Sequence, residues 1–280
     1  MELKARFVVE GFLVGLHKSP YHGFSVEFAE YRQYNPGDPV KNIDWKAYGK
    51  TDRYYIKVFE EETNLRTYIL MDVSGSMSFS SENRMSKLEY GKYLAASFAY
   101  LMQLQKDAVG LTLFDTDVRE ERPPSSTRVN LFEMLKVLET TEAGGDTSAA
   151  EVFFKVARKI GRRGLVVIIS DLYDEPEEII RAIKQFRHMG HEVIVFHIVD
   201  PAEIKFDFKG ETIFEDLEND SKIQTRPWAI RERYQKRFLE YIDYIRMEME
   251  GSQVDYELID TEKTFDVALT AYLHKRGKLA

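Results

Sequence analysis

The chain has 280 residues, a length at which one large domain or two smaller ones can enclose a hydrophobic core. Hydrophobic residues make up 44% and charged residues 31%, which is typical of a folded globular protein and excludes a disordered chain. The net charge of −8 disfavours nucleic acid and anionic lipid as partners, and the absence of cysteine excludes disulfides, thiolate metal sites and cysteine nucleophiles.

No apolar run approaches the ~20 residues that a membrane-spanning helix requires. Charged residues at positions 2, 4, 6 and 10 interrupt the apolar residues of the first 15 positions, which a secretory signal would need as a continuous stretch. The expectation from these two features is a cytoplasmic location without a membrane span.

Residues 1–63 mix glycine, proline, aromatic and charged residues in short pieces. This pattern predicts turns, short strands and one N-terminal helix rather than a long regular element. We interpret the segment as an N-terminal accessory lobe.

Four short apolar runs rich in β-branched residues predict buried strands, and a fifth predicts an edge strand. Nearly continuous apolarity is typical of a parallel sheet that is covered on both faces. The runs are Thr67–Met71, Val109–Phe114, Leu165–Ile169 and Val193–Val199, with Val254–Ile259 as the edge.

Helical patterns lie between these runs. Ser86 and Glu89 form a capping-box sequence before an apolar helix that carries Leu94 and Phe98. Pro176 suits the first turn of a second helix, which Gly190 is placed to end. Alternating strands and helices predict a doubly wound, mostly parallel α/β sheet, Rossmann-like in class, over residues 64–202 and 251–280.

Residues 203–250 interrupt this alternation before the last strand. The sequence predicts a hairpin near Ile204–Phe214 and a long helix after Pro227. The apolar and aromatic residues of that helix are interpreted as core packing on one face, because their spacing fits a helical stripe. They are Trp228, Tyr234, Phe238, Tyr241, Ile245 and Met249.

The four histidines at positions 17, 22, 188 and 191 have no convergent acidic residues near them in the sequence. We interpret them as surface or turn residues, and no zinc spacing is present.

An Asp-x-Ser-x-Ser motif follows the first buried run directly. It consists of Asp72, Ser74 and Ser76. Ligands of open α/β sheets bind at the carboxyl ends of the strands, which is where this motif falls. Carboxylate and hydroxyl oxygens are hard ligands that suit Mg²⁺ or Mn²⁺.

Two other loops are expected at the same edge of the sheet. Gly144 and Gly145 allow a close backbone approach before Thr147, which offers a hydroxyl. Asp171 follows the apolar run that ends at Ile169. The three loops therefore converge in principle on one metal site.

This set of residues resembles the von Willebrand factor type A domain, whose metal ion-dependent adhesion site uses an Asp-x-Ser-x-Ser loop, a Thr and a later Asp. The resemblance implies that Asp72, Ser74, Ser76, Thr147 and Asp171 hold a divalent cation, Mg²⁺ or Mn²⁺. It also implies that a carboxylate from a protein partner fills an open position on that cation. Many members have Asp after the Thr, whereas Ser148 stands there in this chain and Asp146 precedes the Thr.

The upstream sequence resembles the bacterial domain of unknown function fifty-eight family, which joins its own signature to a type A domain. The matching segments are 32–38, 42–47, 51–53 and 59–62. The resemblance implies a partnership with MoxR-type AAA+ ATPases in protein assembly or maturation. The expectation is a non-enzymatic protein-interaction module without catalytic residues.

Two alternatives stay open. An Mg²⁺-dependent phosphatase would use Asp72 as its nucleophile, although Ser74 stands where such enzymes place a second acid. A scaffold with a degenerate metal site would bind through the accessory lobe and residues 203–250.

Overall fold

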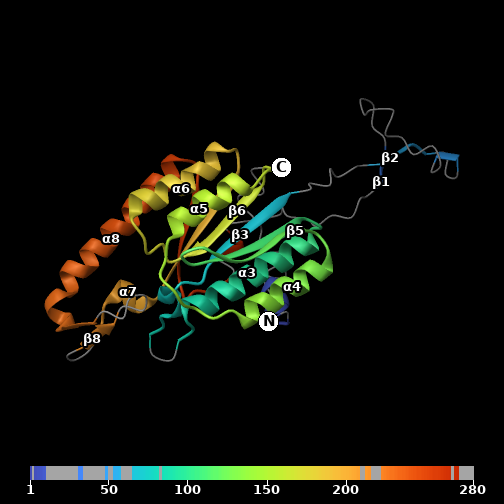
Figure 1. Cartoon of the computed structure of the whole chain (residues 1–280). Helices are drawn as coiled ribbons and strands as arrows, with labels where there is room; N and C mark the ends of the chain where they lie inside the picture. Colours follow the sequence, from blue (N-terminus) through green and yellow to red (C-terminus); the bar gives the residue numbers. More distant parts are fainter. Residues whose placement is uncertain are drawn as a thin grey trace.

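The computed structural model describes residues 1, 3–10, 31–33, 48–49, 53–57, 65–81, 84–208, 212–215, 222–265 and 268–270. A six-stranded sheet forms its centre, in the order β10-β7-β6-β3-β4-β5 (Figure 1). Neighbouring strands are parallel except β5, which runs antiparallel to β4. The strands are β3 (Arg66–Asp72), β4 (Ala108–Phe114), β5 (Val118–Ser125), β6 (Leu165–Ser170), β7 (Glu192–Val199) and β10 (Asp255–Asp260).

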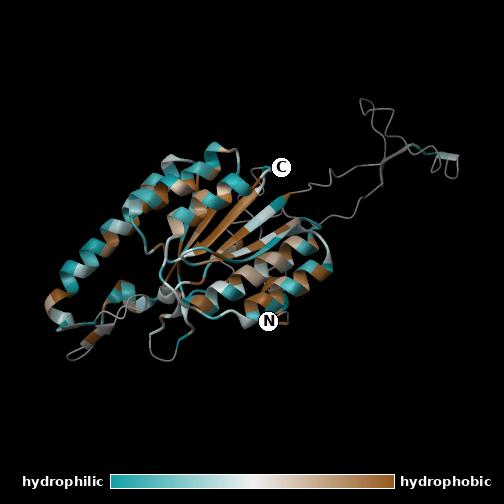
Figure 2. Ribbon diagram, in the orientation of Figure 1, coloured by the Kyte–Doolittle hydropathy of each residue, from teal (hydrophilic) through white to brown (hydrophobic). Residues whose placement is uncertain are grey.

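The four apolar runs and the predicted edge strand all form strands of this sheet, which confirms the doubly wound α/β fold. In Figure 2 the strands form an apolar centre, whereas hydrophilic residues colour the outer sides of the helices. Strand β5 was not predicted, because its sequence VREERPPS is charged and contains two prolines. Proline is tolerated there because an edge strand leaves one row of N–H groups unpaired.

Helices cover both faces of the sheet. Ile69 and Met71 of β3 pack in one core with α3 and α4, whereas Leu70 between them packs in a second core with α5, α6 and α8. Successive side chains of a strand point to opposite faces, so both faces must be apolar. The helices are α3 (Lys87–Leu104), α4 (Arg128–Thr140), α5 (Ala149–Lys159), α6 (Pro176–His188), α7 (Pro201–Lys205) and α8 (Pro227–Gly251).

The predicted helix boundaries follow the local signals. Ser86 accepts a hydrogen bond from the backbone N–H of Glu89 at 3.1 Å, at the start of α3. Pro176 is the first residue of α6, and Gly190 follows its end with φ of +85°. Ser86, Pro176 and Gly190 therefore act as the sequence predicted, with Ser86 supplying the serine half of the predicted capping box.

In the segment before the last strand, the long helix predicted after Pro227 is present as α8, whereas the hairpin lies later than predicted. The short helix α7 occupies the start of the expected hairpin, and the hairpin itself pairs β8 (Thr212–Glu215) with β9 (Lys222–Thr225). The sequence Asp200-Pro201-x-Glu203 explains the helix, because Asp200 and Glu203 form a capping box. Trp228 of α8 is 55% exposed, so its interpretation as core packing was wrong, whereas Phe238, Ile245 and Met249 are buried.

His191 is buried, so its interpretation as a surface or turn residue was wrong. It lies against the rings of Tyr68 and Phe186. His188 is exposed, and His17 and His22 lie outside the described residues.

Part of the N-terminal segment packs on the sheet domain. Residues 3–10 are helical, and Ala5 and Val9 are fully buried in the core that contains α3. Lys4 Nζ donates to the hydroxyl of Tyr93 in α3 at 2.6 Å. Farther along, β1 (Tyr31–Gln33) pairs antiparallel with β2 (Tyr55–Lys57). Most of residues 11–64 lie outside the described residues, and the proposed division into a lobe of residues 1–63 stays a prediction.

Candidate metal centre

The winding of the sheet reverses between β3 and β6, which lie side by side at its centre. Strand β4 extends the sheet on one side of β3, and β7 extends it on the other side of β6. The loops that leave β3 and β6 therefore diverge to opposite faces and leave a crevice at the carboxyl edge, where ligands of such sheets bind.

The Asp-x-Ser-x-Ser motif lies at this crevice, between the end of β3 and the short 3₁₀ helix η2 (Gly75–Ser78). Asp72 is 1% exposed. One of its carboxylate oxygens accepts from the backbone N–H of Ser74 at 2.9 Å, and the other accepts from the Ser170 hydroxyl at 2.6 Å. The Oγ atoms of Ser74 and Ser76 lie 3.2 Å apart. The three predicted residues of the motif are thus brought together.

The loop that contains Thr147 is tied to the motif by backbone hydrogen bonds. Gly144 N–H donates to the carbonyl of Val73 at 3.0 Å, and Gly75 N–H donates to the carbonyl of Gly145 at 2.9 Å. Thr147 is half-buried, two residues beyond this double connection, whereas Asp146 is exposed.

Gly145 is required at its position for two reasons. Its φ is +80°, and a Cβ there would lie 2.8 Å from Oδ2 of Asp115. Arg119 of β5 fixes this contact, because its guanidinium pairs with the Asp115 carboxylate and also donates to the carbonyls of Glu142 and Gly144. The unpredicted strand β5 therefore supports the Thr147 loop.

Asp171 follows β6 directly and is 2% exposed. Its Oδ2 accepts from Nζ of Lys87 at 2.7 Å, and the same ammonium donates to Oε1 of Glu203 at 2.8 Å. Glu203 also accepts from the Tyr173 hydroxyl at 3.2 Å. Asp171 thus takes part in a buried ionic network that links α3, the loop after β6 and α7.

Sequence analysis missed Lys87 and Glu203. A lysine in the first turn of a helix is usually exposed, whereas the Lys87 side chain is 1% exposed. The Asp200–Glu203 capping box was the readable signal for α7, and it could have placed Glu203 at a helix start beside the carboxyl edge.

The charges of this region are not balanced by the protein itself. Asp72, Asp171 and Glu203 carry three negative charges when ionised, and Lys87 carries one positive charge. Burial, and next the negative charge of Asp171, raise the pKa of Asp72 to about 7. For Lys87, burial would lower the pKa, but the carboxylates of Asp171 and Glu203 outweigh it and raise the pKa above its ordinary value. Two negative charges remain, which is the charge that a divalent cation neutralises.

Comparison with known proteins gives the family. The model described as "Protein of unknown function DUF58" matches residues 30–241. The chain belongs to the DUF58 family. An uncharacterized protein of Mycobacterium tuberculosis (strain H37Rv) is 25% identical over 222 residues, which cover 78% of this chain and 69% of that protein.

The fold of this chain is similar to that of a solved bacterial protein. The crystal structure of the conserved hypothetical protein BatB from Bacteroides thetaiotaomicron aligns with a TM-score of 0.53 and 18% identity, over 77% of this chain and 100% of that chain. The SpRpn10 VWA domain aligns with a TM-score of 0.39 and 11% identity, over 73% of this chain and 93% of that chain. At 18% identity, the likeness to BatB supports the α/β fold alone.

The DUF58 match includes all five candidate ligands and the first half of α8 but ends before β10. In the described part of the chain, no helix is both long and apolar enough to cross a membrane. No group of three or more His, Asp or Glu there is arranged to hold a metal ion. Hydroxyl groups would therefore have to complete the ligand set.

The residues of the crevice fit a divalent cation by their chemistry. Ser74, Ser76 and Thr147 offer neutral hydroxyl oxygens, and Asp72 and Asp171 offer carboxylates, all of which are hard ligands. Burial, and next the negative charge of Asp171, raise the pKa of Asp72, so a cation bound beside this carboxyl would favour its ionised form.

Proposed function

We propose that this DUF58 protein is a non-enzymatic interaction module that binds a carboxylate of a protein partner through Mg²⁺ or Mn²⁺. The observation that carries the proposal is the buried Asp72 carboxyl beside the paired Ser74 and Ser76 hydroxyls, at the carboxyl edge of the sheet where Asp171 also lies. A divalent cation would supply a Lewis-acidic position for an incoming Asp or Glu.

Each residue has a separate task in this proposal. Ser74, Ser76 and Thr147 would bind the cation through neutral oxygens, which leave its charge available to a partner. Asp72 and Asp171 would offset that charge. Lys87 would partly neutralise the negative charge of Asp171, because its ammonium forms an ion pair with one oxygen of that carboxylate.

A non-enzymatic role is supported by the surroundings of Asp72. Ser74 stands two residues after Asp72, where a phosphatase of the kind considered would need a second acid, and the hydrogen bonds to the Asp72 carboxylate come from Ser74 and Ser170, which are neither acids nor bases at neutral pH. The buried His197 instead pairs with the hydroxyl of Tyr256 at 2.6 Å, and burial lowers its pKa to about 4. It is a poor general base at neutral pH.

The partner class follows from the family resemblance. A MoxR-type AAA+ ATPase in the cytoplasm, acting in protein assembly or maturation, is the partner that we propose for this site. Such a partner would present an Asp or Glu on an exposed loop to the carboxyl edge of the sheet.

The test measures binding of the purified chain to a purified MoxR-type ATPase, without nucleotide, in Mg²⁺, in Mn²⁺ and in a chelator. We expect binding only with metal, its loss in Asp72→Ala, and its retention in Asp207→Ala, which removes an exposed aspartate outside the crevice. Equal affinity in the chelator would contradict the metal-dependent role. Metal-dependent hydrolysis of an aryl phosphate that is lost in Asp72→Asn would instead favour the phosphatase.

A further inference from the structure

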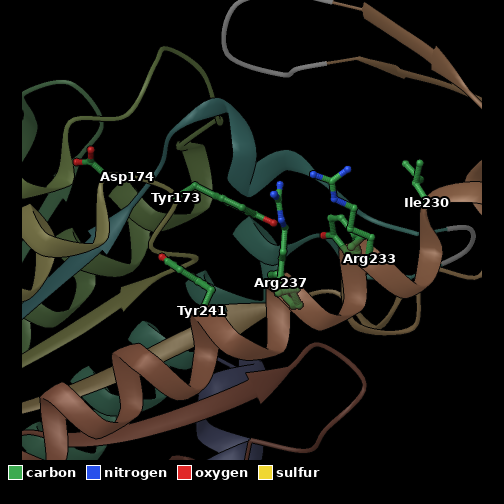
Figure 3. Close-up of a pocket in the computed structure, with 8 residues that line it drawn as sticks. Tyr173, Asp174, Ile230, Arg233, Arg237 and Tyr241 are labelled. Atoms are coloured by element: carbon green, nitrogen blue, oxygen red, sulfur yellow. The ribbon is translucent and has the colours of Figure 1, made fainter.

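A pocket of about 500 Å³ lies between α8 and the loop that follows β6. We call it the α8 pocket. Its volume is within the range of protein ligand sites, which is roughly 300–1,000 Å³. Residues that line it include Tyr173 and Asp174 from the loop and Ile230, Arg233, Arg237 and Tyr241 from α8 (Figure 3). The pocket adjoins the candidate metal centre, because the Tyr173 hydroxyl donates to Glu203, which shares the Lys87 ammonium with Asp171.

The floor of the α8 pocket is aromatic and held in place by hydrogen bonds. The Tyr241 hydroxyl donates to the carbonyl of Leu172 at 2.6 Å, and the Tyr173 hydroxyl donates to Glu203. Tyr234 stacks on Phe206 with ring centroids 4.2 Å apart. An apolar floor with fixed rings needs little reordering when a ligand binds, which favours affinity.

Hydrogen bonds to α7 and its C-cap residue fix the part of α8 that carries the two arginines of the pocket. Arg231 Nε donates to the carbonyl of Phe206 at 2.7 Å, and Gln235 donates to the carbonyl of Lys205 at 2.8 Å. These bonds hold the first half of α8 against α7. The backbone positions of Arg233 and Arg237 are therefore fixed relative to the pocket.

The wall from α8 is positively charged. Arg233 and Arg237 are one helical turn apart, and both are exposed. Within the part of the chain that the structure describes, neither guanidinium forms an ion pair, whereas Lys236, Arg246 and the neighbouring Lys184 all pair with acids. In Figure 3 both arginines rise from α8 toward the Tyr173 loop, while Asp174 lies at the far end, away from Arg233.

The carboxylate of Asp174, at the far end of the pocket, forms hydrogen bonds with the backbone through both of its oxygens. One oxygen of the Asp174 carboxylate accepts from the N–H of Ala150 at 3.2 Å, and the other accepts from the N–H of Glu175 at 2.8 Å. Asp174 keeps its negative charge, and Arg233 and Arg237 are the cationic side chains among the residues that line the pocket. Two guanidinium groups next to aromatic rings are complementary to a ligand in which carboxylates flank an apolar or aromatic side chain.

We propose that the α8 pocket is a second, metal-independent docking site, which takes an acidic peptide segment of a protein partner. An apolar or aromatic side chain of that segment would lie on the tyrosine floor, and flanking carboxylates would bind Arg233 and Arg237. Arg233 and Arg237 are exposed on α8, so an extended peptide can reach both side chains from solvent. The proposal does not depend on the metal centre, because no candidate metal ligand lines the pocket.

The test uses the full chain and a fluorescein-labelled, capped peptide of sequence Glu-Glu-Phe-Glu-Glu, with binding followed by fluorescence anisotropy in a chelator. We expect saturable binding that the Arg233→Gln/Arg237→Gln double variant weakens at least about fivefold, because two charge-assisted contacts are lost. Lys236→Gln is the matched control: it removes an exposed cation of the same helix that does not line the pocket, and it should bind like the parent. Both variants change exposed side chains, so their thermal unfolding should match the parent.

Two further peptides define the chemistry of the ligand. Replacing each Glu by Gln should weaken binding as much as the arginine variant does, and replacing Phe by Ser should weaken it as well. Equal binding by the parent and the double variant would overturn the proposal, and so would equal binding of the Glu and Gln peptides. Residues 215–220 of the chain are themselves acidic in four of six positions. Peptide binding that appears only after these acids are neutralised would assign the pocket to the chain's own segment and overturn its assignment to a partner.

Discussion

At the scale of single residues, Gly145 sets the position of the Thr147 loop. Its φ of +80° strains any residue with a Cβ, and that Cβ would meet the Asp115 carboxylate at 2.8 Å. We expect Gly145→Ala to lower the free energy of unfolding by about 1–2 kcal/mol, measured by urea denaturation. Gly161→Ala is the control, since a Cβ there meets nothing within 4 Å. Equal stability of the two variants would show that the loop adapts without strain.

Asp72 gives the metal-free protein a characteristic dependence on pH. Its folded-state pKa of about 7 lies above the unfolded value of about 4. Between these values the native state keeps a proton that the unfolded chain releases, so the free energy of unfolding falls as the pH rises through this window.

We therefore expect the urea midpoint of the chelated protein to fall between pH 5 and pH 7 more steeply than that of Asp72→Asn, which cannot lose this proton. Added Mg²⁺ should reduce the difference, because a bound cation favours the ionised carboxylate. Parallel pH profiles for the parent and the variant would contradict the assigned pKa.

At the scale of elements, Lys87 joins α3 to the loop after β6 and to α7. Its removal would leave the buried Asp171 and Glu203 without their shared counter-charge. We expect Lys87→Met to lower the free energy of unfolding by roughly 3–5 kcal/mol, as removal of one member of a buried ion pair does.

Two measurements separate this cause from a simple packing defect. Adding Glu203→Gln to Lys87→Met should recover part of the loss, because one unpaired carboxylate disappears. Saturating Mg²⁺ should also stabilise Lys87→Met more than the parent, since the cation restores positive charge beside Asp171. A loss that neither change reduces would contradict the ionic role of Lys87.

The elements differ in how far their sequences predict them. Buried parallel strands such as β6 are continuous apolar runs, so both their existence and their burial could be predicted. Strand β5 could not be found in this way, because an antiparallel edge strand needs neither apolarity nor freedom from proline. The Asp72 and Asp171 loops were predictable because the parallel strands β3 and β6 end at the same edge of the sheet. The Thr147 loop connects α4 to α5, and hydrogen bonds to Val73, Gly75 and Arg119 hold it at that edge. Lys87 was not predictable, because only the tertiary fold brings α7 against the first turn of α3.

At the scale of the whole molecule, the fold places the candidate metal centre and the α8 pocket on one edge of the sheet. The order of the strands brings the Asp72 and Asp171 loops to the crevice between β3 and β6, and backbone hydrogen bonds tie the Thr147 loop to the Asp72 loop. The segment between β7 and β10 adds α7 and α8 beside that crevice, and with them the α8 pocket. The hydroxyl-rich crevice would take a carboxylate through a cation, and the arginine-lined pocket would take carboxylates directly. An acidic partner surface satisfies both features.

Binding of a divalent cation in the crevice can be measured by calorimetric titration of the purified chain with Mg²⁺ and Mn²⁺, beside Asp72→Ala and the control Asp207→Ala. The account predicts saturable binding by the parent and by Asp207→Ala, with none by Asp72→Ala. Binding of equal affinity in Asp72→Ala would contradict it, and so would the absence of binding to the parent at millimolar metal.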